Sequence, residues 1–98
     1  MKTSLRVIVC EHDGHWTAQA LEYDIGAQAN SLEELARRFH VTIQLDRQYS
    51  IDKFGEAFKG IEPAPQFFHD LWETADQNFD PKVDFDGDDV DMHIALAA

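Results

Sequence analysis

The residues best suited to chemistry are the aspartates near the C-terminal end of the chain. They lie between residues 80 and 91 beside a single lysine, and they are Asp80, Asp84, Asp86, Asp88, Asp89 and Asp91, with Lys82. Carboxylates at alternate positions from Asp84 to Asp88 are similar to the start of a calcium-binding loop. In such a loop the sixth residue is Gly and the twelfth is a bidentate Glu, whereas this chain has Asp89 and Ala95 there. The pattern therefore favours a plain acidic turn over a divalent-cation site.

The charge of the whole chain bears on what this acidic run can bind. Nineteen acidic and eight basic residues give a formal net charge of −11, which opposes binding to a phosphate backbone. The run is either a solvated loop that aids solubility or a patch that steers a basic partner toward the chain. The candidate partner-binding residues are Asp84, Asp86, Asp88, Asp89, Asp91 and Trp16. Trp16 is included because an exposed tryptophan anchors interfaces, although a strand tryptophan also packs beneath a helix.

Four other carboxylates are candidates for a catalytic metal site. A two-metal site of the ribonuclease-H kind needs several carboxylates that converge from different strands. The acids Asp13, Glu22, Asp24 and Asp91 show no characteristic spacing for such a site. We therefore expect no enzyme activity, no bound metal and no cofactor. The alternative is a metal-dependent hydrolase or a divalent-metal-binding domain that uses the Asp84–Asp91 cluster.

Alternating side chains predict three strands in the first third of the chain. Leu5–Cys10 is apolar and β-branched, His15–Tyr23 alternates between two faces, and Ile25–Ala29 is a short strand of small residues. Asp13-Gly14 between the first two strands is typical of a two-residue hairpin turn. These segments predict a small antiparallel sheet.

A helix is predicted to follow at Ser31. Ser31 and Glu34 have the spacing of a capping box, in which the hydroxyl and the carboxylate each bind a free backbone N–H. One apolar stripe then recurs at helical spacing and consists of Leu32, Leu35, Ala36, Phe39 and Ile43. We expect this helix to end near Arg47 or Gln48.

The second half of the chain predicts a connector, a helix and a closing strand. Ser50–Gly60 is the connector, and Pro63 and Pro65 mark the start of a helix that runs to about Asn78. Its apolar stripe, expected mainly in the core, is Phe67, Phe68, Leu71, Trp72 and Ala75. Asp89–Ala98 alternates again and predicts a C-terminal strand. The fold class expected is α+β: a small, mainly antiparallel sheet with a β-β-β-α core, a second helix and a C-terminal strand.

Size and composition predict one domain over residues 1–98. No apolar run is long enough to span a membrane. Met1–Ser4 leads directly into a strand rather than into the apolar stretch of a signal peptide. The single cysteine, Cys10, cannot form an internal disulfide and suits a reducing compartment. We therefore expect a cytoplasmic location.

Two stretches of the first half resemble the HicB-like antitoxin family. Residues 11–18 (EHDGHWTA) combine an acidic residue, a Gly turn and a strand led by an aromatic. Residues 29–35 (ANSLEEL) place a helix cap before Glu-Glu. The resemblance covers about half of the chain, and it implies a partial ribonuclease-H-like fold with a β-β-β-α-β core.

The resemblance also implies a function through protein–protein contact. HicB-like domains are similar in role to covers that occlude a small basic RNA-cleaving toxin, so a HicA-like toxin is the partner that it implies. Full antitoxins of this kind add a DNA-binding module, but none follows Ile43, and the later helix has no basic recognition face. We therefore expect no direct nucleic-acid binding. Exposed sheet edges also favour self-pairing, so a homo-oligomeric adaptor is the neighbouring alternative.

Overall fold

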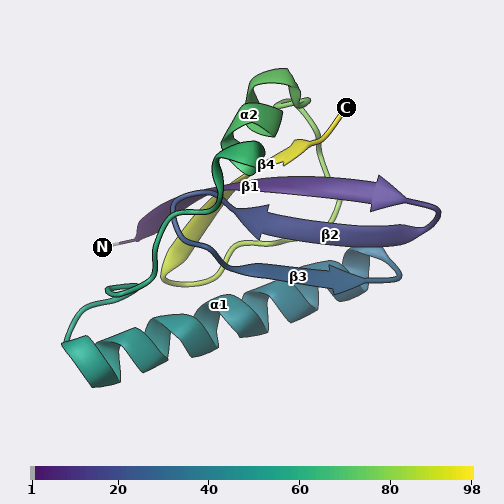
Figure 1. Cartoon of the computed structure of the whole chain (residues 1–98). Coiled ribbons are helices and arrows are strands. Elements are labelled where there is room, and N and C mark those ends of the chain that lie inside the picture. Colours follow the sequence, from purple (N-terminus) through teal and green to yellow (C-terminus); the bar gives the residue numbers. More distant parts are fainter. Residues whose placement is uncertain (1) are drawn as a thin grey trace.

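A computed structural model describes residues 2–98 (Figure 1). Met1, the first residue of the Met1–Ser4 stretch discussed above, lies outside the described residues. The elements are β1 (Thr3–His12), β2 (His15–Ala20), β3 (Gly26–Ala29), α1 (Leu32–Phe54), α2 (Gln66–Thr74) and β4 (Val90–Leu96). The strands form one sheet in the order β3-β2-β1-β4. The pairs β1–β2 and β2–β3 are antiparallel, whereas β4 lies parallel to β1. The expected α+β fold with a mainly antiparallel sheet is therefore confirmed.

The hairpin between β1 and β2 turns at Asp13 and Gly14, as predicted. Both residues have positive φ, 50° and 78°, which a primed two-residue turn requires and which Gly adopts without steric cost. β2 ends at Ala20 rather than at Tyr23. A tight turn follows it, in which the Ala20 N–H donates to the Ile25 carbonyl at 2.9 Å. This turn brings β3 back alongside β2.

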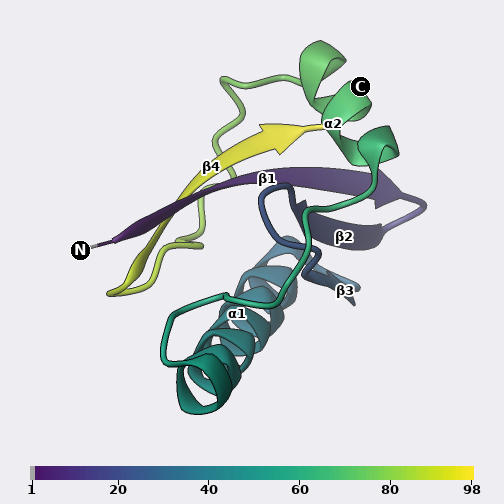
Figure 2. The ribbon, with the colours of Figure 1, turned by 60° about the vertical axis from the view of Figure 1, so that its left-hand side comes forward.

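Helix α1 covers one face of the sheet and forms the main core with it (Figure 2). Phe39 and Ile43 of its predicted stripe are fully buried. The Ser31 Oγ accepts a hydrogen bond from the Glu34 N–H at 3.2 Å, which confirms the N-cap. The prediction that the Glu34 carboxylate accepts a backbone N–H at the cap is wrong. That carboxylate pairs with the guanidinium groups of Arg37 and Arg38 instead, because they lie one helical turn away on the same side.

Helix α1 runs to Phe54, well beyond the end expected from the sequence. Ser50 is buried and occupies the core position seven residues after Ile43, so the stripe continues with a polar residue. Gly55 ends the helix with a φ of 80°, and its N–H donates to the Ile51 carbonyl at 2.8 Å. Despite this length, neither α1 nor any other helix of residues 2–98 is apolar enough to cross a membrane.

Helix α2 packs on the opposite face of the sheet (Figure 2). Trp72 is buried there against a small second core of Ile8, Leu21 and Ala95. The helix is shorter than expected, because the chain leaves the helical path at Ala75 to form a bridge with the end of β4. Phe67, expected in the core, is 63% exposed. The prediction of a buried stripe is therefore correct for Trp72 and wrong for Phe67.

Candidate partner-binding site

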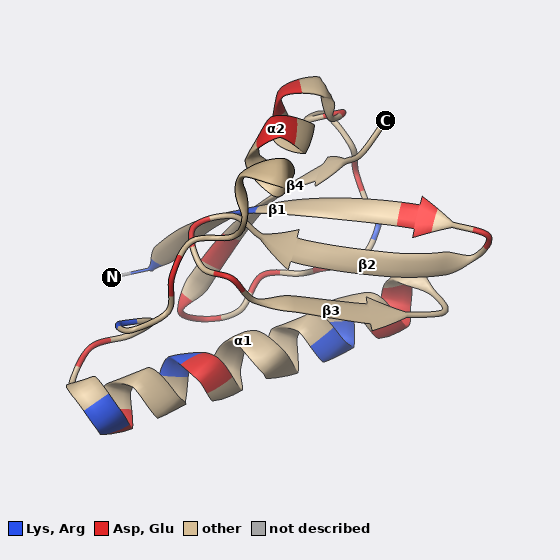
Figure 3. Cartoon of the chain, viewed as in Figure 1, with Lys and Arg blue, Asp and Glu red and all other residues tan. Residues whose placement is uncertain are grey.

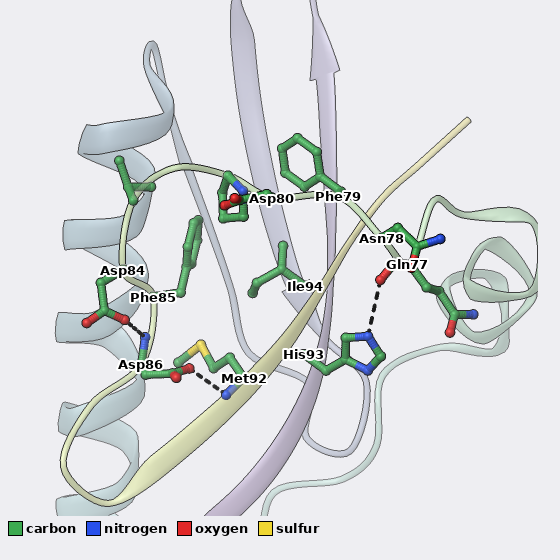
Figure 4. Close-up of a pocket in the computed structure, with 12 residues that line it drawn as sticks. Gln77, Asn78, Phe79, Asp80, Asp84, Phe85, Asp86, Met92, His93 and Ile94 are labelled. Carbon is green, nitrogen blue, oxygen red and sulfur yellow. Dashed lines mark hydrogen bonds between the residues drawn. The ribbon is translucent and has the colours of Figure 1, made fainter.

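The candidate aspartates lie on residues 80–89, here termed the acidic segment, and at Asp91 in β4. The segment arches from the end of β4 across to α1 and returns to the start of β4, so that a pocket separates its middle from the strand (Figure 4). Near its start, Asp76 and Leu96 form an antiparallel bridge with N–H···O distances of 2.8 and 3.0 Å. Near its end, the Gly87 N–H donates to the Val90 carbonyl at 3.0 Å. The segment is therefore tied to β4 near both ends of the strand.

Carboxylates shape the acidic segment by binding backbone N–H groups. Asp80 accepts from the Lys82 N–H and Asp84 from the Asp86 N–H, both at 2.9 Å. Asp86 accepts from the Met92 N–H at 2.7 Å, which satisfies an outward-facing donor of β4. The Lys82 N–H and ammonium hold the pKa of Asp80 below its ordinary value. These aspartates therefore set the path of the segment as well as its charge.

The inner side of the acidic segment is apolar. Phe85 is buried, and its ring centroid lies 6.5 Å from that of Phe39 in α1. Val83, which is half-buried, packs against the same core. At Gly87 the backbone approaches α1 so closely that a Cβ would lie 2.9 Å from His40 Cε1. The segment is therefore fixed between β4 and α1.

The charges of the site are only partly neutralised. Asp89 lies 3.7 Å from Arg47 Nη1 on α1, and Asp91 lies 3.2 Å from Lys2 Nζ. The remaining candidates are exposed and form no ion pair within residues 2–98, and they are Asp84, Asp86 and Asp88. Their carboxylates are available to a partner.

A pocket of about 300 Å³ opens between the acidic segment and β4 (Figure 4). Buried and half-buried apolar residues form its floor, and they are Phe79, Pro81, Val83, Phe85, Met92 and Ile94. Exposed polar residues form its rim, and they are Gln77, Asn78, Asp80, Asp84, Asp86 and His93. The pocket thus combines an apolar interior with carboxylates at its mouth.

Trp16 lies apart from the aspartates. It is level with Glu11 in β1, whereas Val90, where the acidic segment ends, is level with Thr3. These two levels are separated by roughly 26 Å along β1, at about 3.3 Å per residue. Trp16 is half-buried and packs against the core on the α1 side of the sheet. The structure therefore does not join Trp16 to the aspartates in one surface.

The described residues do not form the metal site that the metal-dependent alternative requires. Nowhere in residues 2–98 are three His, Cys, Asp or Glu side chains grouped so that they could hold a metal ion. Glu22 accepts from Arg6 Nε at 2.6 Å, and Asp24 accepts from Gln19 Nε2 at 3.0 Å. These carboxylates contribute to local structure rather than to a common centre.

Comparison with known proteins identifies no relative of this chain. No protein-family model, curated protein or solved structure matches this chain. The HicB-like resemblance therefore stays a prediction. The charge of the acidic segment and the pocket beside it are the features that indicate a function.

The sequence indicated the charge of this site but not its apolar side. The run of aspartates was expected to be a plain acidic turn or a solvated loop, and none of the apolar residues within it was assigned a role. Val83 and Phe85 alternate with Asp84 and Asp86, which is the period-two pattern of a chain with one buried face. That alternation is the signal that would have predicted a packed segment.

Proposed function

We propose that this chain is a HicB-like protein-interaction domain that binds a small basic protein and catalyses no reaction. The partner class implied by the resemblance is a HicA-like RNA-cleaving toxin, which such a domain neutralises by covering it. We place the interaction in the cytoplasm, because Cys10 is a free thiol and free thiols persist in reducing compartments. The role requires no DNA-binding module and no direct contact with nucleic acid.

The observation that carries the proposal is the pocket beside the acidic segment (Figure 4). Lys and Arg side chains join an apolar stem to a charged head. Val83 and Met92 offer apolar surface for the stem, and Asp84 and Asp86 offer carboxylates for the head. One basic side chain of a partner therefore has complementary groups at both of its ends.

The net charge of −11 supports the same class of partner. A strongly acidic surface speeds encounter with a basic protein and repels nucleic acid. Association driven by exposed charge weakens as salt screens it. A basic RNA-binding protein is thus attracted to this surface, whereas its RNA is not.

The test is affinity capture of the tagged chain from lysate of its source organism, at low and then moderate salt. The informative variant replaces four charges, Asp84→Asn, Asp86→Asn, Asp88→Asn and Asp89→Asn. Asn keeps a side-chain carbonyl that can accept the turn bonds, so the variant removes charge while preserving the acceptors. We expect one small basic protein to be captured by the native chain, and its affinity to fall by about tenfold or more with the variant.

A matched control removes four charges elsewhere, at exposed acids outside the site: Glu56→Gln, Glu62→Gln, Asp70→Asn and Glu73→Gln. The proposal requires that this control retain the captured protein at the same salt concentration. Equal losses in both variants would indicate a general charge effect. That result, or capture unchanged by either variant, would overturn the assignment of the site.

A further inference from the structure

A second surface of the molecule lies on the far edge of the sheet from the acidic segment. β3 is the edge strand opposite β4. A groove runs between β3 and α1, lined by Gly26, Ala27, Gln28, Arg37, Arg38, Val41 and Thr42. From Val41 in this groove, an exposed apolar stripe continues along α1 at four-residue spacing. Val41, Leu45 and Tyr49 of this stripe are 49%, 65% and 59% exposed.

The backbone of β3 presents outward-facing hydrogen-bonding groups beside this stripe. The Ala20 N–H donates to the Ile25 carbonyl, and inward-bonded residues alternate along an antiparallel strand. Gly26 and Gln28 therefore point their N–H and C=O groups outward. Arg38 Nη1 donates to the Gln28 carbonyl at 3.0 Å, which agrees with that direction. A carbonyl has a second lone pair, so the edge still accepts a neighbouring strand.

The charge of this face differs from that of the rest of the molecule. α1 carries the acids Glu33, Glu34, Asp46 and Asp52, and the bases Arg37, Arg38, Arg47 and Lys53. Its charges therefore cancel, and β3 has none. The whole formal charge of −11 lies outside these two elements. Figure 3 shows both colours of charge on α1, whereas red predominates on the loops.

We propose that this face, formed by β3 and the Val41-Leu45-Tyr49 stripe of α1, binds a second copy of the same chain. The two β3 strands lie antiparallel across a two-fold axis, and the two stripes pack against each other. The groove places β3 beside Arg37–Thr42 of α1, so the two-fold axis passes near Val41 and the two Val41 side chains meet across it. Like charges repel two copies over most of their surface, and this neutral face is where they meet without that repulsion.

The dimer is separate from the proposed binding of a basic protein. The acidic segment lies beside the β4 edge, and the dimer uses the β3 edge at the other side of the sheet. Both acidic segments of the dimer therefore stay accessible. Failure of one proposal leaves the other untouched, because each is tested by variants on a different edge.

The experiment is a mass measurement of the full chain in solution, by light scattering or sedimentation, over a series of concentrations. We expect a mass of twice the 11.2 kDa of one chain at high concentration. Leu45→Glu places a charge in the centre of the stripe and is expected to weaken the dimer by roughly tenfold or more. Gln28→Pro removes an outward-facing donor of β3 and is expected to weaken it as well.

The matched control is Phe67→Glu, which charges an equally exposed apolar residue on α2, away from the face. It is expected to leave the dimer intact. A second measurement is mild oxidation in a Cys10→Ala background, which removes the native free thiol. Val41→Cys, which lies beside β3, is expected to give a disulfide-linked dimer, whereas Phe67→Cys is not. The proposal is overturned by a single-chain mass at every concentration. It is also overturned by a dimer that Phe67→Glu disrupts and Leu45→Glu does not.

Discussion

The carboxylate of Asp86 accepts the backbone N–H of Met92 at 2.7 Å, so a loop side chain takes the place of a neighbouring strand at the edge of β4. An unpaired strand edge is a template for pairing with other chains. Here the acidic segment occupies that edge with its own charged residues. The acidic segment proposed to bind a partner therefore also hinders the pairing of β4 with a strand of another chain.

The first prediction concerns this bond. We expect Asp86→Ala to lower the free energy of unfolding by about 1 kcal/mol, because the Met92 N–H loses its acceptor. Asp86→Asn, which retains an acceptor, is expected to stay near the native value. Urea unfolding checks the free energy, and amide hydrogen exchange checks the Met92 N–H. Unchanged exchange at Met92 in Asp86→Ala would contradict the role of the bond.

The second prediction concerns the N-cap of α1. Ser31→Ala removes the acceptor for the Glu34 N–H and is expected to cost about 1 kcal/mol of unfolding free energy. Ser31→Asp restores an acceptor and places a negative charge at the helix N-terminus, so it is expected to recover that loss. Asn30→Ala, at the neighbouring exposed position, serves as the control in chemical denaturation. An equal effect at Asn30 would argue against the cap.

The third prediction concerns pH. Hydrogen bonds from Arg37 and then Arg38 hold the pKa of the Glu34 carboxyl below its ordinary value. A pKa lowered by folding adds stability that is present above the unfolded-state pKa and is lost as the pH falls through the folded-state pKa. The effect on stability is expected to be small, because exposed pairs contribute little. Carboxyl NMR titration is expected to show the pKa of Glu34 rising in the double variant Arg37→Gln, Arg38→Gln.

The control for that titration is Arg47→Gln, because Arg47 pairs with Asp89 rather than with Glu34. We expect it to leave the Glu34 titration unchanged. A pKa of Glu34 that moves with Arg47 and not with Arg37 and Arg38 would show that the assigned pairs do not form in solution.

The fourth prediction concerns Phe58 in the connector. Its side chain is 1% exposed and stacks on Tyr23 with ring centroids 4.7 Å apart, although its φ is 63°. The packing outweighs the strain of a left-handed backbone. We expect Phe58→Ala to cost about 3 kcal/mol in chemical denaturation. Phe54→Ala, at a position that is 44% exposed, is expected to cost about 0.5 kcal/mol or less.

The fifth prediction addresses metal binding. Residues 2–98 contain no group of three His, Cys, Asp or Glu side chains that could hold a metal ion. We therefore expect Mg²⁺, Mn²⁺ and Ca²⁺ to leave the thermal unfolding midpoint unchanged. A ligand that binds the native state raises that midpoint. A rise that disappears in Asp84→Asn with Asp86→Asn would restore the metal-dependent alternative.

Local patterns in the sequence predicted most of the fold. The alternation in β1 and β4, the turn at Asp13 and the cap at Ser31 all depend on near neighbours, and each is confirmed. The end of α1 depends on tertiary packing, because Ser50 is a polar residue that only the folded core identifies as buried.

The candidate site was predicted only in part for a related reason. A run of aspartates is visible in the sequence, but the pocket beside it depends on where β4 pairs. The separation of Trp16 from those aspartates depends on strand register, which no local pattern specifies. The Val41-Leu45-Tyr49 stripe has helical spacing, yet only the folded structure distinguishes it from the core stripe.

The parallel pairing of β1 with β4 joins the two ends of the described chain, with Thr3 opposite Val90. During synthesis, β1 leaves the ribosome well before its β4 neighbour. A nascent chain that already holds the hairpin and α1 still exposes one side of β1 to the cellular milieu. Contacts between residues so distant in sequence also form slowly. The sheet is therefore completed only after β4 has left the ribosome, and a chain that stalls before β4 presents β1 as an open edge to chaperones and proteases.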